Sequence, residues 1–262
     1  MQKLEWDCLV LATEKLTDSF FILTLQGETI SQTARPGQFV NLSCREFLRR
    51  PFGIMTVDPV AGTFKIGIQI KGHGTQQLSQ LRPGDTVSVL GPLGHGFDLG
   101  DYRRVMTVGG GTGVFPLYFV QEQCRAQGLE SIAVCGYRSI QDAILVDEFR
   151  AIASGSVMAS DTGGLDIHGH AGQALDAALA KLPYDGQTLI LTCGPKIMMQ
   201  TVAGRAQELK IPCQVSLEER MGCGMGICLV CVCKIKAKES GVISHQRCCV
   251  EGPVFAAEDV VW

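Results

Sequence analysis

The sequence has little net charge, and this excludes two broad classes of protein. Its 262 residues carry 23 lysines and arginines against 26 aspartates and glutamates. This balance leaves no basic excess for gripping a phosphate backbone, so we expect no nucleic-acid partner. With 46% hydrophobic residues and a net charge of −3, the composition also excludes disorder as the main state.

Long apolar runs are also missing. No window reaches the roughly 18 uninterrupted apolar residues of a membrane-spanning helix, and the N-terminal residues Met1–Asp7 lack the apolar core of a signal peptide. We find no internal repeat and no low-complexity tract. We therefore expect a cytoplasmic protein without membrane contact, in which thiols stay reduced.

The length limits what else the chain can hold. At roughly 100–200 residues per domain, 262 residues suggest two domains, or two domains and a small module. A (β/α)8 barrel takes about 250 residues by itself. If motifs of other domains are present, this chain has no room for such a barrel.

Cysteine, by contrast, is abundant and unevenly placed. Six of the 12 cysteines are scattered before residue 215, and the other six crowd between residues 223 and 249. Cys223, Cys228 and Cys231 have the spacing C-x4-C-x2-C, and a further cysteine follows at Cys248 or Cys249. This is the spacing of plant-type [2Fe–2S] ligands, and Gly224 and Gly226 would let the loop approach a cluster closely. A structural zinc site is the alternative, although zinc more often uses C-x2-C pairs. Spacing alone does not choose between Cys248 and Cys249.

The first part of the chain has the pattern of a small antiparallel β domain. The runs 4–12, 19–26 and 63–70 are rich in β-branched and aromatic residues, and residues 65–70 alternate with period two. Turn signals such as Arg35-Pro36-Gly37 separate these runs. The pattern predicts a barrel or a sandwich.

From about residue 101 strands alternate with helices. Apolar runs at 105–108, 131–135, 156–159, 188–192 and 215–217 predict strands, and the segments 116–127, 173–181 and 196–209 predict helices. Such alternation indicates βαβ units on a parallel sheet. We therefore divide the chain at residues 1–99, 100–214 and 215–262, the last part holding the cysteine group.

Two turns in the α/β part are candidate nucleotide-binding segments. Gly109, Gly110, Gly111, Thr112 and Gly113 follow a strand and open a helix, where backbone N–H groups can bind a pyrophosphate. The run is no strict G-x-G-x-x-G, and a tight crossover would explain it equally well. Cys193, Gly194 and Pro195 end a later strand, at the edge of the sheet where ligands bind. Cys193 is otherwise a small buried residue before a turn.

The β part offers two candidate anion-binding segments. Arg49 and Arg50 precede the rigid turn at Pro51, either as a phosphate clamp or as the charged defence of an exposed edge strand. Gly74 and Thr75 lie in a turn ahead of a predicted helix, whose start could bind an anion. We interpret His73 as an exposed turn residue.

Taken together, these motifs resemble those of the ferredoxin–NADP reductase superfamily. Their order and the short gap before the last cysteine are similar to those of the electron-transfer subunits of class B dihydroorotate dehydrogenases. The resemblance covers the whole chain, through Arg49–Phe52, Gly91–Phe97, Gly109–Gly113 with Pro116–Tyr118, Cys193–Pro195, Glu218–Gly224 and Cys249–Phe255.

The resemblance implies a multidomain β plus α/β fold: an antiparallel flavin-binding β-barrel, a nicotinamide-binding parallel α/β sheet and a small C-terminal [2Fe–2S] module. It selects Cys249 as fourth ligand beside Cys223, Cys228 and Cys231. It also implies an FAD site at Arg50, Pro51, Phe52, Gly53, Gly67, Ile68, Gln69, Gly74 and Thr75. At position 53 the family commonly has Ser, so a side-chain hydroxyl facing the flavin is missing here.

The implied activity is an electron relay. A nicotinamide exchanges two electrons at once and a [2Fe–2S] cluster carries one, so a flavin must stand between them. By resemblance, electrons from dihydroorotate oxidation at FMN in a catalytic partner subunit reach NAD⁺ through [2Fe–2S] and FAD, in a heterotetramer of pyrimidine biosynthesis. The alternatives are a reductase subunit of another redox complex, such as a glutamate synthase-like, hydrogenase-type or oxygenase system, and a zinc-bound interaction module. Asp161 is a candidate for reading the ribose of NAD(H).

Overall fold

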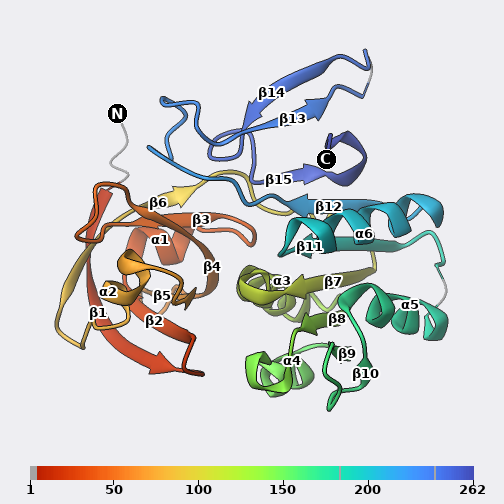
Figure 1. Cartoon of the computed structure of the whole chain (residues 1–262), viewed down its shortest axis with the longest axis horizontal. Helices are drawn as coiled ribbons and strands as arrows, with labels where there is room; N and C mark the ends of the chain where they lie inside the picture. Colours follow the sequence, from red (N-terminus) through yellow and green to blue (C-terminus); the bar gives the residue numbers. More distant parts are fainter. Residues whose placement is uncertain (1–4, 183, 239) are drawn as a thin grey trace.

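Six antiparallel strands close into a barrel in the N-terminal part of the structure (Figure 1), a computed structural model that describes residues 5–182, 184–238 and 240–262. In β5, Phe64, Ile66 and Ile68 are fully buried and alternate with half-buried Thr63 and Lys65, so one face of each strand fills the barrel. The strands, in the order β1-β2-β5-β4-β3-β6 around the barrel, are β1 (Glu5–Lys15), β2 (Phe20–Gln26), β5 (Thr63–Gln69), β4 (Arg50–Asp58), β3 (Phe39–Leu42) and β6 (Thr86–Leu93).

The pairing of β4 in the barrel bears on the edge-strand interpretation of the segment with Arg49 and Arg50. Strand β4, which carries Arg50, pairs with β3 on one side and β5 on the other. Only residues 54–58 of β4 pair with β5, whereas residues 50–53 pair with β3 alone, so the edge-strand interpretation of the arginine segment stays open. The short helices α1 (Glu28–Thr33) and α2 (His73–Leu78) fill two connections of the barrel.

The second part is a seven-stranded sheet in the order β10-β9-β8-β7-β11-β12-β15. All neighbouring strands in it are parallel except β12 and β15, which are antiparallel. The parallel βαβ prediction is confirmed. The strands are β7 (Arg104–Gly110), β8 (Glu130–Tyr137), β9 (Gly155–Ser160), β10 (Ile167–His168), β11 (Thr188–Cys193), β12 (Cys213–Ser216) and β15 (Val254–Ala256).

Helices cover both faces of this sheet. Phe115 of α3 (Val114–Gln127) and Phe149 of α4 (Val146–Ile152) share one apolar cluster with the sheet, on the side of the barrel. Leu175 of α5 (Ala171–Lys181) and Val202 of α6 (Lys196–Glu208) pack on the opposite face. Single 3-10 turns lie at Gly111–Gly113, Ile140–Asp142 and Ala257–Asp259. In the described part of the chain, no helix is long and apolar enough to cross a membrane.

The cysteine-rich part is connected to the sheet at both of its ends. After β12 the chain forms a loop that carries Cys223, Cys228 and Cys231, which we call the cysteine loop. The hairpin of β13 (Val232–Lys236) and β14 (Ile243–Arg247) follows it. It then returns as β15, which pairs with β12 itself. The sequence pattern predicted neither the hairpin nor the returning strand, because each is only three to five residues long.

Candidate functional site

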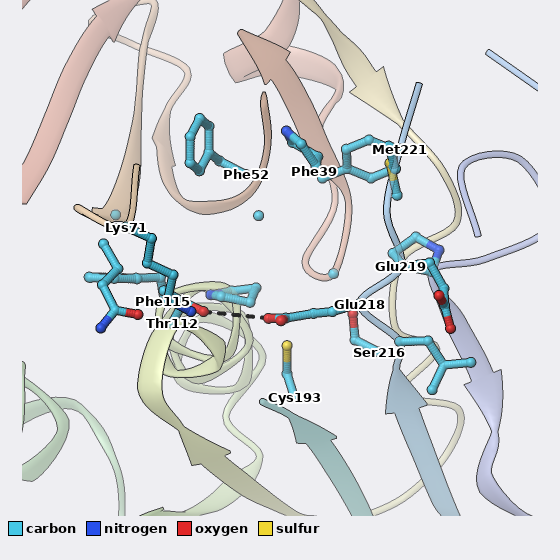
Figure 2. A pocket seen from close by; sticks show the side chains of 18 of the residues that line it. Phe39, Phe52, Lys71, Thr112, Phe115, Cys193, Ser216, Glu218, Glu219 and Met221 are labelled. Carbon is cyan, nitrogen blue, oxygen red and sulfur yellow. Dashed lines mark hydrogen bonds between the residues drawn. The ribbon is translucent and has the colours of Figure 1, made fainter. Parts of the chain in front are cut away.

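A cavity of about 270 Å³ lies where the barrel, the sheet and the start of the cysteine-rich part meet. Figure 2 shows its walls: Phe39 and Phe52 come from the barrel, and Phe115 comes from the start of α3. Ser216, Leu217, Glu218, Glu219 and Met221 close it from the segment that leaves β12. Concave sites with apolar walls and a few polar groups are typical of cofactor pockets.

Most of the predicted FAD residues line this cavity. Pro51, Phe52, Gly53, Gly67, Gln69 and Thr75 all contribute to its wall. Ile68 does not, because its side chain is fully buried in the barrel core. Arg50 and Gly74 are not part of the cavity wall, but they lie next to each other, since a Cβ built on Gly74 would lie 3.0 Å from Nε of Arg50.

Two glycines let the sheet domain approach the barrel at this cavity. A Cβ on Gly67 would lie 2.1 Å from Cδ1 of Phe115, so only glycine allows that ring to lie against β5. A Cβ on Gly53 would lie 3.0 Å from Cβ of Pro116. The glycine that replaces the family's serine therefore has a packing reason, since a larger residue would press on the start of α3.

The glycine-rich turn reaches a second cavity of about 620 Å³. Gly110, Gly111, Thr112 and Pro195 line it, at the carboxyl ends of β7 and β11, where α/β sheets bind ligands. Thr112 and Glu218 line both cavities, so the two cavities are adjacent.

Three glycines of the two turns, Gly109, Gly113 and Gly194, have packing roles. A Cβ on Gly113 would lie 2.1 Å from the carbonyl oxygen of Cys193, and one on Gly194 would lie 2.7 Å from that of Gly110. A Cβ on Gly109 would lie 2.9 Å from Cδ1 of Leu117. These close contacts fit the crossover interpretation of the turn, and the nucleotide interpretation of Gly110, Gly111 and Thr112 stays a prediction.

Two charged side chains, Lys71 and Glu218, line both cavities. Desolvation between the two domains raises the pKa of the Glu218 carboxyl, although Lys71 and the Thr112 hydroxyl at 3.4 Å lower it. Burial raises the pKa of the Cys193 thiol, and Glu218 raises it further, so the thiol is neutral at physiological pH. Figure 2 shows Glu218 pointing into the cavity toward Thr112, with Cys193 beside it. Glu218 begins the matched segment Glu218–Gly224, but sequence reasoning did not select it as a site residue, and Lys71 lies outside the motif segments.

Asp161, the candidate ribose-reading residue, lines the second cavity together with Arg138, Asp142 and His170. Asp161 follows β9 directly, and its backbone N–H bonds to the carbonyl of Tyr137 at the end of β8. The carboxyl ends of neighbouring strands thus gather polar side chains around one cavity. The sequence offered no signal for Arg138, Asp142 or His170 beyond their positions after strands.

The cysteine loop directs backbone N–H groups at a thiol. The Sγ of Cys223 accepts hydrogen bonds from the N–H groups of Met225, Ile227 and Cys228 at 3.3, 3.3 and 3.4 Å. Desolvation raises the pKa of this thiol, but these bonds outweigh it and lower the pKa to about 6. Thiolate ligands of iron–sulfur clusters are stabilised by such N–H groups.

The four predicted ligands lie in two pairs. Cys223 and Cys228 interact through their side chains, as do Cys231 and Cys249. Desolvation and the contact with Cys231 raise the pKa of Cys249 to about 12. A [2Fe–2S] cluster takes two thiolates on each iron, so a paired arrangement fits it.

Cys248 and Cys233 form a separate pair. Their thiols hydrogen-bond to each other, which lowers the pKa of Cys233 and raises that of Cys248. Cys248 is fully buried, and its N–H bonds to the carbonyl of Cys231 at 2.9 Å. Its side chain therefore interacts mainly with Cys233, although Cys231 also raises its pKa.

An ion pair between Arg247 and Glu251 supports the cysteine loop. Arg247 bonds to the Glu251 carboxylate, which holds the pKa of Glu251 near 2, and its Nη1 donates to the carbonyl of Gly226 at 2.9 Å. A Cβ on Gly226 would lie 2.6 Å from Val250. The turn before Cys249 thus supports the loop that carries Cys223 and Cys228.

Two family descriptions match parts of this chain. Residues 8–97 match an oxidoreductase FAD-binding domain. Residues 218–261 match the iron–sulfur cluster binding domain of dihydroorotate dehydrogenase B. The matched segments contain the barrel and the cysteine-rich part.

Whole-chain similarity extends to curated proteins and solved structures. The chain is 37% identical to the dihydroorotate dehydrogenase B (NAD(+)) electron transfer subunit of Bacillus caldolyticus, covering 97% of both chains. The subunit of the same name from Desulforamulus reducens is 36% identical over 98% of each. The solved NADH-dependent reduced ferredoxin–NADP oxidoreductase is 31% identical with a TM-score of 0.86, covering 97% of this chain and 90% of that one. Ferredoxin NADP+ reductase from Neisseria gonorrhoeae shares the fold at 16% identity, with a TM-score of 0.67 over 79% of this chain and 92% of that one.

Proposed function

This chain belongs to the family of dihydroorotate dehydrogenase B electron transfer subunits, and we propose that it passes electrons from a catalytic partner subunit to NAD⁺ through a [2Fe–2S] cluster and FAD. One observation carries the proposal. Ser216, Glu218 and Met221 line the first cavity, of about 270 Å³, which we call the flavin-type cavity. The cysteine loop begins two residues after Met221, at Cys223. A single short segment therefore joins the candidate flavin and cluster sites.

Each part of the chain has a distinct task in this relay. Bound FAD would exchange two electrons with NAD(H) and one with the cluster. The walls formed by Phe52, Phe115 and Pro116 would exclude water from the ring system. In this proposal Arg50 and Thr75 would hold the pyrophosphate, and the turn Gly110–Thr112, which lines the second cavity, would hold the nicotinamide nucleotide.

Glu218 and Cys193 would act on the nicotinamide side. The raised pKa of Glu218 lets its carboxyl hold a proton more readily than an ordinary glutamate, and Thr112 fixes its direction. The neutral Cys193 thiol presents a small, uncharged surface at the end of β11. We assign Cys223, Cys228, Cys231 and Cys249 as cluster ligands, with one pair on each iron.

The oxidation of dihydroorotate would take place in the partner. The described residues form a barrel, one α/β sheet and a cysteine-rich part, and contain no (β/α)8 barrel. We propose an FMN-containing catalytic subunit as the partner, in a cytoplasmic heterotetramer with two copies of each chain, serving pyrimidine biosynthesis. We retain 1–99, 100–214 and 215–262 as the proposed division into domains.

The decisive experiment combines a spectrum with an assay of the complex. The purified chain is expected to show flavin and [2Fe–2S] absorption, and the co-purified complex is expected to reduce NAD⁺ with dihydroorotate. A colourless chain with stoichiometric zinc would contradict every redox interpretation. An intact, coloured complex without dihydroorotate activity would instead favour a second candidate, a reductase subunit of another redox complex, which the 31% identity to the ferredoxin–NADP oxidoreductase supports.

Exposed apolar side chains on the cysteine loop suggest where the partner binds. Met225, Ile227, Leu229 and Val230 are 46%, 76%, 60% and 54% exposed, and they lie between or beside three predicted ligands. An apolar patch of this kind marks an interaction site, and a partner seated there would come within reach of the cluster.

We predict that Ile227→Asp weakens association with the catalytic subunit by about tenfold or more, because a buried charge in an interface is costly. Val60→Asp is the matched control, since Val60 is fully exposed on the turn between β4 and β5 of the barrel. Association is measured by titration of the two purified chains. Equal affinities for the two variants would place the interface elsewhere.

A further inference from the structure

Asn41 is a buried polar residue whose side chain lacks a partner among the described residues. It lies in the middle of β3 with none of its surface exposed, and both Nδ2 and Oδ1 are buried without a hydrogen bond. Its backbone is in order, because β3 pairs with β4 and β6 and Arg49 donates to its carbonyl at 3.3 Å. Buried amides almost always have partners, so this one calls for an explanation.

The side chain of Asn41 points out of the barrel toward the cysteine loop. Its neighbours Val40 and Leu42 belong to the barrel core, so the alternation of a strand directs Asn41 to the other face. There a Cβ built on Gly224 would lie 2.5 Å from Nδ2 of Asn41. Gly224 follows Cys223 directly and has a φ of +71°, so the loop backbone turns against the amide nitrogen.

The surroundings of Asn41 on this face are apolar. Leu90 and Leu93 of β6 share one buried cluster with Cys231 and Cys249 of the cysteine-rich part. Asn41 does not line the flavin-type cavity, whereas Phe39, two residues earlier on the same strand, does. The amide is therefore a polar group in the contact between barrel and cysteine loop, outside the flavin pocket.

We propose that Nδ2 of Asn41 donates a hydrogen bond to a sulfur atom of the cluster site, either the Cys223 thiolate or a sulfide beside it, and thereby raises the reduction potential of the cluster. The proposal rests on the [2Fe–2S] assignment in the proposed function. Sulfur ligands accept hydrogen bonds, and the nitrogen is the amide atom placed against Gly224. Reduction adds one negative charge, so a donor stabilises the reduced cluster more than the oxidised one.

Asn41 is thus a positioning residue that links β3 of the barrel to the cluster. The three N–H groups at Cys223 come from the loop itself, whereas this donor comes from another part of the chain. Movement of the loop away from β3 would therefore alter the potential without changing any ligand.

The test is a redox titration of the cluster, followed by electron paramagnetic resonance, in the intact complex carrying Asn41→Leu. Leucine matches the size of asparagine and the apolar surroundings but donates no hydrogen bond. We expect wild-type iron content and a tenfold lower ratio of reduced to oxidised cluster at a fixed potential, about 59 mV for one electron. In D2O, the exchangeable deuteron coupling contributed by Asn41 should also disappear, while the couplings of the three N–H groups at Cys223 remain. Ser88→Ala, in the Arg49 and Glu5 network of β6, is the control and should leave the potential unchanged.

The outcomes separate this proposal from the proposed function. A wild-type complex without any cluster signal would contradict the function itself. Wild-type iron content with an unchanged potential in Asn41→Leu would overturn the role of Asn41. If Asn41→Leu loses iron, Asn41→Thr, which keeps a donor on a side chain suited to a strand, is titrated instead. A deuteron coupling in Asn41→Thr beyond those of the three loop N–H groups supports the proposal, and loss of iron in both variants would make Asn41 purely structural and overturn it.

Discussion

Cys249→Ser is expected to abolish cluster assembly, whereas Cys248→Ser should keep most of the iron. Cys249 lies against Cys231 and completes the second of the two thiol pairs, so its loss removes a ligand from one iron. Cys248 is occupied by its hydrogen bond to Cys233. We expect iron and acid-labile sulfide to fall below about a tenth of the wild-type content in the first variant only.

The adjacent positions make this a matched comparison. Both residues are buried, at 2% and 0% exposure, and both changes are thiol to hydroxyl, so general damage to the fold should affect the two variants alike. Iron, sulfide and visible circular dichroism are measured on each purified chain. Equal iron retention in both variants, or loss in Cys248→Ser alone, would refute the assignment of Cys249.

Arg50→Leu is expected to weaken FAD binding by about tenfold to a hundredfold, which corresponds to a charge-assisted hydrogen bond of about 1.5–3 kcal/mol. The guanidinium of Arg50 lies beside Gly74 and donates to the carbonyl of Leu48 at 2.6 Å. Within the part of the chain that the structure describes, it forms no ion pair, so its charge is available for a phosphate.

The neighbouring arginine provides the control. Arg49 pairs with Glu5 at 2.5 Å and donates to Ser88, so its charge is already matched inside the barrel wall. Arg49→Leu should lower the free energy of unfolding by about 1–3 kcal/mol and leave the FAD content of the folded fraction unchanged. FAD affinity is measured by fluorescence titration of the apoprotein, and thermal unfolding is followed separately. A larger loss of FAD affinity in Arg49→Leu than in Arg50→Leu would reverse the two roles.

Sequence reasoning succeeded where chemistry depends on spacing along the chain. C-x4-C-x2-C brings Cys223, Cys228 and Cys231 onto one loop whatever surrounds them, and a glycine run between strand and helix needs no distant partner. Strand alternation likewise predicted the parallel sheet, since hydrophobic period is a local property.

Features that depend on distant contacts were out of reach. Gly67 is required because Phe115 lies against it, and the sequence around either residue does not predict that contact. Glu218 acquires its raised pKa only where the two domains meet. Barrel closure is likewise a property of all six strands together.

The return of β15 to β12 bears on how electrons can move. Many electron carriers are tethered by a single linker and must swing between donor and acceptor. Here the cysteine-rich excursion starts from one strand of the nicotinamide sheet and comes back to pair with that same strand, through Gln214, Val215 and Ser216. Such a double attachment makes the distance between cluster and flavin sites a fixed property of the fold. The rate of transfer within this chain should therefore be insensitive to solvent viscosity, and any gating must lie at the contact with the partner.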